Sequence, residues 1–248
     1  IGIVRAAEII LVTEEIDYDW DGLRDDHSLE SFLISEGHSV DVRPEYWNVL
    51  TPENISELNA ADLIIVSRLA WSSRYNQGNE TTEWNSLTTP LLQMNSHFAR
   101  NSRWKWVNSD AKEPDDTSYI YAEAINPSHP VFRGVSLVRY DPIASDVSLN
   151  VVEMIDPLIG TGFTAFIDGI DMGNGQLIAK PLVLETGWIA EWDAGVEFYE
   201  GAVQFAGGKR MLFCAGTREI QYYDEERQQV MATAQGELNL TVEGLQMF

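Results

Sequence analysis

The stretch "EIILVT", residues 8–13, centres on four consecutive apolar side chains, three of them β-branched. Such a run is typical of a β-strand buried on both faces, as in a parallel sheet covered by helices. Two further runs have the same character, "ADLIIVS" (61–67) and "PLLQM" (90–94). Together the three runs predict a parallel sheet in the first half of the chain.

The segments between these runs predict the connections that parallel strands require. Residues 25–38 place apolar side chains at helical spacing, and residues 39–44 alternate like a strand near a sheet edge. Thr51 offers a hydroxyl cap, and the proline after it suits the first position of a helix. Strands that alternate with helices in this way predict right-handed crossovers.

"RWKWVNS" (103–109) predicts a fourth strand of the parallel sheet. The strand signals change in the second half of the chain. "TSYIYAEAI" (117–125), "GQLIAKPLVLE" (175–185) and "WIAEWD" (188–193) then predict antiparallel strands joined by Gly-rich and Asp-rich turns. "MLFCAG" (211–216) returns to the doubly buried pattern.

The predicted fold class is therefore α/β: a flavodoxin-like, doubly wound, mostly parallel sheet with antiparallel strands added in the second half. We find no internal repeat or linker, which predicts one domain over residues 1–248. "LTVEGLQMF" (240–248) predicts a last helix that stops with the sequence, and the first residue is not Met. We therefore expect a piece of a longer multidomain protein or a homo-oligomer.

The charge of the chain excludes two classes of partner. The 248 residues include 39 acidic and 16 basic side chains, for a net charge of −23. Such a surface repels phosphate backbones and anionic lipids, so we expect no nucleic-acid partner and no membrane partner. The charge fits a soluble protein in a saline or extracytoplasmic setting, where salt screens self-repulsion, and cation binding is the alternative explanation.

Four segments carry patterns that resemble a known superfamily. They are "HPVFRGV" (129–135), the stretch 195–216 in which glycines and a basic residue precede an apolar strand, the closing residues 240–248, and the block 62–110. In this order they resemble the class I glutamine amidotransferase-like superfamily, and its ThuA-like (trehalose utilisation) branch in particular. The block 62–110 is also similar to an uncharacterised bacterial group with this fold, found in large surface-associated proteins.

The resemblance draws attention to Ser96 and His97, at a predicted strand-to-helix turn. In the amidotransferases the nucleophile sits on a Gly-x-Cys-x-Gly elbow, but Met94 and Phe98 occupy the glycine positions here. Neighbouring side chains on a helix do not face each other, and no His follows the late strand. We therefore expect a non-catalytic domain. The alternative is a hydrolase or carbohydrate-modifying enzyme around Ser96, His97 and the acidic loop 17–26. Its titratable residues would be Glu14, Asp17, Asp19 and His97.

The acidic loop "DYDWDGLRDDHS" (17–28) has carboxylates at the spacing of a calcium loop. The twelfth position, where a glutamate should close the coordination shell, is Ser28. The alternative is a solvated loop whose acids cap the following helix. We therefore expect either no cofactor or calcium, with the ligands Asp17, Asp19, Asp21 and Asp25.

The loop that follows the run 61–67 combines aromatic and polar side chains. In doubly wound sheets, ligands bind beyond the carboxyl ends of the strands, where this loop would lie. Aromatic faces with amide and guanidinium donors suit a carbohydrate or another small polar molecule. The alternative is that the aromatic rings pack the loop onto the domain. The predicted ligand-binding residues are Arg68, Trp71, Arg74, Tyr75 and Asn95.

Overall fold

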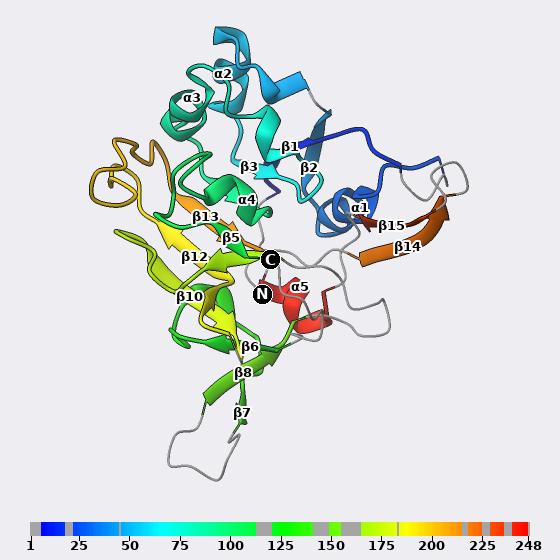
Figure 1. Cartoon of the computed structure of the whole chain (residues 1–248), viewed down its shortest axis with the longest axis vertical. Helices are drawn as coiled ribbons and strands as arrows, with labels where there is room; N and C mark the ends of the chain where they lie inside the picture. The colour runs from blue at the N-terminus through cyan, green and yellow to red at the C-terminus, as the bar shows by residue number, and fades with distance from the viewer. Residues whose placement is uncertain are drawn as a thin grey trace.

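A ten-stranded sheet runs through the protein in the order β2-β1-β3-β4-β13-β12-β10-β6-β8-β7 (Figure 1). The computed structural model describes residues 6–17, 22–44, 46–112, 121–140, 149–154, 165–182, 184–214, 218–224, 229–235 and 240–247. Buried apolar residues from both halves of the chain form one contiguous cluster around this sheet.

Five neighbouring strands of the sheet run parallel, and they include the three apolar runs of the first half. Each is paired in parallel with the next across the sheet. The apolar centre of β1 and most of β3 are buried, as expected for strands covered on both faces. The parallel strands are β2 (Ser39–Pro44), β1 (Glu8–Thr13), β3 (Leu63–Val66), β4 (Leu91–Gln93) and β13 (Arg210–Phe213).

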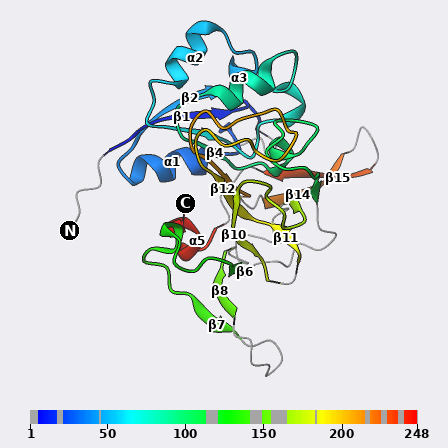
Figure 2. The ribbon, with the colours of Figure 1, turned by 90° about the vertical axis from the view of Figure 1, so that its left-hand side faces the viewer.

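The other five strands of the large sheet are antiparallel, as predicted for the second half. They equal the parallel strands in number, so the sheet is mixed, not mostly parallel. In both views they extend away from the parallel half and end at β7 (Figure 1 and Figure 2). They are β12 (Ile189–Trp192), β10 (Gln176–Pro181), β6 (Tyr121–Ala124), β8 (Leu149–Glu153) and β7 (Val138–Tyr140).

Two small sheets accompany the large one. The first joins β11 (Thr186–Gly187), β9 (Phe166–Asp168) and β5 (Ala111–Lys112). The second is a hairpin of β14 (Arg218–Asp224) and β15 (Gln229–Gln235).

The helices are short. They are α1 (His27–Ser35), α2 (Pro52–Leu58), α3 (Glu80–Ser86), α4 (Ser96–Ala99) and α5 (Val242–Met247), with 3-10 turns η1 (Tyr46–Asn48), η2 (Ser72–Arg74) and η3 (Pro130–Phe132). The predicted helices at 25–38, after Thr51 and near the end of the sequence are confirmed. Thr51 caps α2 as expected, since its hydroxyl accepts the Asn54 N–H at 3.2 Å. Within the described ranges we find no helix with the length and apolar character needed to cross a bilayer.

The prediction of a strand at 103–109 is wrong. This segment is a series of turns, and Lys105 has a φ of 60°. Trp104 and Trp106 are fully buried, and their indole N–H groups donate to the Tyr75 carbonyl (2.9 Å) and the Asn85 side chain (2.8 Å). The place beside β4 is taken by β13, from much later in the sequence. The alternation of apolar and polar residues at 103–109 therefore comes from two buried, hydrogen-bonded indole rings, not from a strand.

Two consecutive glycines bring β13 into place. A Cβ on Gly207 would overlap the Ser86 carbonyl, and a Cβ on Gly208 would overlap the Thr88 carbonyl. Only residues without a side chain allow the chain to run this close to the segment between α3 and β4. The same segment is bound by Arg210, the first residue of β13.

Arg210 is fully buried, and its guanidinium donates only to backbone carbonyls. Burial lowers its pKa to about 10, so the group is still charged at neutral pH. No carboxylate of the described chain pairs with it. The carbonyls at the end of α3 carry partial negative charge, which stabilises the cation. They belong to Trp84, Asn85 and Leu87, with Thr89 and Lys209 completing the set.

Replacing Arg210 by Met tests this contact. The variant keeps an apolar stem but leaves buried carbonyls without donors, and we expect the free energy of unfolding to fall by about 3 kcal/mol. Urea unfolding gives the value. Arg133→Met is the matched control, since Arg133 is exposed, and it should change stability by less than about 0.5 kcal/mol. Equal losses in the two variants would show that the Arg210 contacts contribute nothing special.

Candidate functional site

The carboxyl ends of β1, β3 and β4 meet at one edge of the sheet. Val12 of β1 pairs with Val66 of β3, and Val66 pairs with Gln93 of β4, so the strands end level with one another. The loops after these strands therefore lie side by side, where parallel α/β sheets bind their ligands. They supply the polar residues described next.

Asp26, just before α1, lies at the centre of a buried network. Its carboxylate accepts the Thr13 hydroxyl at 2.5 Å, the Ser67 hydroxyl and the Arg24 Nε–H. Asp26 is fully buried and Arg24 also binds Glu30 at 3.1 Å. The network ties the loops after β1 and β3 to the start of α1, and it leaves Asp26 with a full set of donors.

Glu14 follows β1 and organises the loop after β3. Its side chain is 1% exposed, and one carboxylate oxygen accepts the Trp71 backbone N–H at 2.6 Å. The other oxygen accepts Arg74 Nη1 at 2.7 Å. The Arg74 guanidinium lies 4.9 Å from the centre of the Trp71 ring, while Trp71 itself is 49% exposed. We call Glu14, Trp71 and Arg74 the Trp71–Arg74 platform.

Tyr75, predicted to contact a ligand, is fully buried instead. Its ring packs at 5.9 Å from that of Trp84 and at 5.2 Å from that of Phe98. Tyr75 therefore fixes the loop to the core and does not offer a face to a ligand. Trp71 is the aromatic residue of this loop that reaches solvent.

Asn95 also holds the loop after β3. Its buried side-chain amide donates to the carbonyls of Arg68 (3.2 Å) and Ala70 (3.0 Å), and its oxygen accepts the His97 N–H at 3.0 Å. Arg68 is half-buried, and its positive charge favours the thiolate form of Cys214, which directly follows β13. Burial nevertheless raises the pKa of that thiol far above its usual value. The five predicted ligand residues belong to neighbouring loops; Tyr75 and Asn95 are buried, Arg68 and Arg74 are half-buried, and Trp71 is exposed.

The turn at Ser96 lacks the geometry of a nucleophile elbow. Asn95 has φ −118° and ψ 107°, an extended conformation, and Ser96 begins α4. In the part of the chain that the structure describes, the non-glycine residues with positive φ are elsewhere, at Lys105 and Val203. The strain that exposes the nucleophile in an elbow is therefore missing.

Ser96 is also not paired with a base. Its hydroxyl is buried and makes no hydrogen bond within the described chain. The pKa of Asp110 is lowered, first by the hydrogen bond from the Ala111 N–H and then by Arg100 and His97. An electrostatic partner of His97 is therefore Asp110. A serine without a base stays a poor nucleophile. The neighbouring Ser96 and His97 therefore do not form a catalytic pair in this structure.

The calcium prediction involves residues that the structure describes only in part. Asp17 accepts the Gly22 N–H at 3.0 Å, and Asp25 is 7% exposed. Asp19 and Asp21 lie outside the described residues. Where side chains are described, we find no group of three or more acidic, His or Cys residues that could hold a metal ion. Calcium binding by this loop stays a prediction.

The sequence patterns named Glu14 only as a member of the alternative enzyme site, and Asp26 only as part of the acidic loop 17–26; neither was predicted to hold the loops together. Glu14 directly follows β1 and Asp26 directly precedes α1, positions at which acidic residues are often solvated. The available signal was weak: hydroxyl residues end the apolar runs at Thr13 and Ser67, where buried polar groups need partners.

Removing the Asp26 carboxylate should destabilise the fold. Asp26→Ala strips Arg24 and two hydroxyls of a buried partner, and we expect a loss of about 3 kcal/mol or more in unfolding free energy. Asp41→Ala is the control, because the Asp41–Arg43 ion pair is at the surface and should contribute less than about 1 kcal/mol. Similar losses in urea unfolding of both variants would refute a structural role of the network.

Calcium binding can be measured by thermal unfolding. A ligand at 100 times its Kd stabilises the folded state by about 2.7 kcal/mol, so the Tm should rise with millimolar calcium. The rise should vanish when Asp19→Ala and Asp21→Ala are combined. A Tm that is the same with calcium and with a chelator would leave the loop as solvated surface.

Comparisons with known proteins identify no family and give partial structural similarities at low sequence identity. No protein-family model matches the sequence, and no curated protein matches it. A cytoplasmic protein from Salmonella typhimurium is similar in structure with a TM-score of 0.48 and 16% identity, over 83% of this chain and 86% of that one. A protein from Bacteroides uniformis described as ThuA-like gives a TM-score of 0.44 and 10% identity, over 87% and 85%.

Proposed function

We propose that the chain is a non-catalytic binding domain that takes a carbohydrate or another small polar molecule on the Trp71–Arg74 platform. The observation that carries the proposal is the double contact of buried Glu14 with the Trp71 backbone and the Arg74 guanidinium. Because Glu14 fixes both residues in the free protein, a ligand would not have to order them on binding.

Exposure of Trp71 supports this role. The structure describes seven tryptophans, and six of them are buried: Trp47, Trp84, Trp104, Trp106, Trp188 and Trp192. Trp71 is 49% exposed, although burying a large ring is favourable. A rigid aromatic face held out in solvent is a common feature of binding sites.

The position of the platform supports it as well. We infer that the parallel half of the sheet is of the flavodoxin-like type, because its strand order is β2-β1-β3-β4-β13. In such sheets ligands bind outside the carboxyl ends of the strands, and the platform lies on the loops after β1 and β3.

The chemistry of the platform favours a polar, uncharged ligand. The Trp71 ring can stack on the apolar face of a sugar, and the Arg74 guanidinium can donate to its hydroxyl groups. Glu14 balances the Arg74 charge at 2.7 Å, which reduces the attraction for anions. The absence of a base beside Ser96 and the full set of donors on Asp26 support binding without catalysis.

Replacing Trp71 by Ala tests the proposal. Binding of mono- and oligosaccharides is screened by thermal shift and then measured by titration calorimetry. We expect Trp71→Ala to weaken binding of any sugar that binds by at least about tenfold, because truncating an aromatic anchor usually costs more than 1 kcal/mol. Its Tm without ligand should stay close to that of the original chain, since the ring is half exposed.

The matched control is Phe205→Ala, which removes an aromatic ring that is 55% exposed on another loop. This variant should bind the same sugars with unchanged affinity. Equal affinity of the Trp71 variant, or no binding of any sugar to the original chain, would eliminate the carbohydrate proposal.

A further inference from the structure

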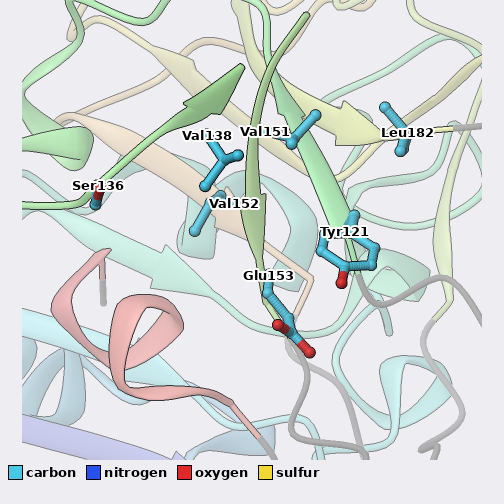
Figure 3. Close-up of a pocket in the computed structure, with 7 residues that line it drawn as sticks. All are labelled: Tyr121, Ser136, Val138, Val151, Val152, Glu153 and Leu182. Carbon is cyan, nitrogen blue, oxygen red and sulfur yellow. The ribbon is translucent and has the colours of Figure 1, made fainter. Parts of the chain in front are cut away.

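A pocket lies on the antiparallel half of the sheet, on other strands than the platform (Figure 3). Its volume is about 490 Å³, and its walls are mainly the apolar residues of β6, β7 and β8 with Leu182. Pockets that bind small organic molecules have volumes of about 300–1,000 Å³ and mostly apolar walls with a few polar groups. The pocket therefore has the size and lining of a small-molecule site.

The strand register sets the order of side chains in the pocket. Tyr121 of β6 is directly opposite Glu153 of β8, and Val138 of β7 is directly opposite Val151 of β8. Directly opposite residues place their side chains on the same face of a sheet. Figure 3 shows the Tyr121 hydroxyl and the Glu153 carboxylate at one end of the pocket, with Val151 and Leu182 toward the other. The pocket thus has a polar end and an apolar end.

Two of the side chains that line the pocket are exposed to solvent. Val138 is 61% exposed and Tyr121 is 40% exposed. Together they leave apolar surface in contact with water, which a bound apolar group would cover. Val151 beneath them is buried and gives the pocket a fixed floor.

The only charged side chain that lines the described pocket is Glu153. Its carboxylate has no hydrogen bond and no ion pair within the described chain. The next carboxylate along this face, Glu123, pairs with Lys180 at 3.6 Å, and Lys180 is shared with Glu185 at 2.5 Å. No described residue therefore compensates the negative charge of Glu153, and its complement is a cation.

We propose that this pocket binds a small organic cation, a protonated amine joined to an apolar body. The ammonium group pairs with the Glu153 carboxylate and lies near the Tyr121 ring, which attracts cations through its π face. The apolar body covers Val138, Val151 and Leu182. The net charge of −23 raises the local concentration of cations and repels anions.

Titration calorimetry of the whole chain with 2-phenylethylamine tests the proposal. 2-Phenylethanol and phenylacetate are the neutral and anionic probes of similar shape. We expect the amine to bind at least about tenfold more tightly than either, which is the effect of one modest charge pair. Equal affinity for the three probes, or no binding of the amine at millimolar concentration, would overturn the proposal.

Two variants locate the binding. Glu153→Gln keeps the shape of the side chain and should lower the affinity for the amine about tenfold. Val138→Lys changes an exposed position on an edge strand, puts a built-in cation beside Glu153 and should abolish binding of the amine. Glu200→Gln, an exposed carboxylate on the loop before β13, is the control and should bind as the original chain does. Unchanged affinity in Val138→Lys would overturn the proposal even if Glu153→Gln did not fold.

Discussion

The buried guanidinium of Arg210 is the contact on which the two halves of the sheet depend. β13 pairs in parallel with β4 on one side and antiparallel with β12 on the other, so it joins the parallel strands to the antiparallel ones. A buried charge without a carboxylate is unfavourable unless hydrogen bonds replace its lost water. The backbone carbonyls between Trp84 and Thr89 supply these bonds, and the glycines at 207 and 208 allow the chain to come close enough. The end of α3 and the start of β4 are thereby fixed against β13.

An aromatic cluster strengthens the same junction. Trp84 stacks on Trp104 at 5.2 Å, and Trp106 stacks on Phe198 at 5.6 Å and packs against Trp192 at 5.5 Å. These rings come from α3, the turns at 103–109, β12 and the loop before β13. Their burial explains why the chain contains so many tryptophans, and it separates the structural indoles from Trp71, which the core does not use.

The sequence was informative wherever a local pattern decides the structure. The apolar runs located β1, β3 and β4, and the Thr51 cap located α2, because burial and capping act over a few residues. The apolar run 211–216 indicated β13, but its place beside β4 could not be predicted locally, since Arg210 contacts carbonyls more than 120 residues away. The candidate site likewise contains some residues that a local pattern predicts and others that it does not. Trp71 and Arg74 stood out by composition, whereas the role of Glu14 in holding them could not be predicted, because these partners are 57 and 60 residues away.

Charge compensation distinguishes the two proposed sites. Several acids with little exposure are paired: buried Glu14 with Arg74, buried Asp26 with Arg24, and half-buried Glu191 with Lys209 (2.7 Å) and His129 (3.3 Å). Burial opposes the ionisation of Glu191, but its two partners outweigh that effect and hold its pKa below the ordinary value.

The Glu14–Arg74 ion pair leaves the platform close to neutral, which suits a polar molecule without charge. Glu153 lies outside this pattern, in a pocket whose other walls are mainly apolar. In a chain with a net charge of −23, a carboxylate that no described side chain pairs with, beside apolar surface, selects for cations, so the two halves of the sheet should prefer chemically different ligands.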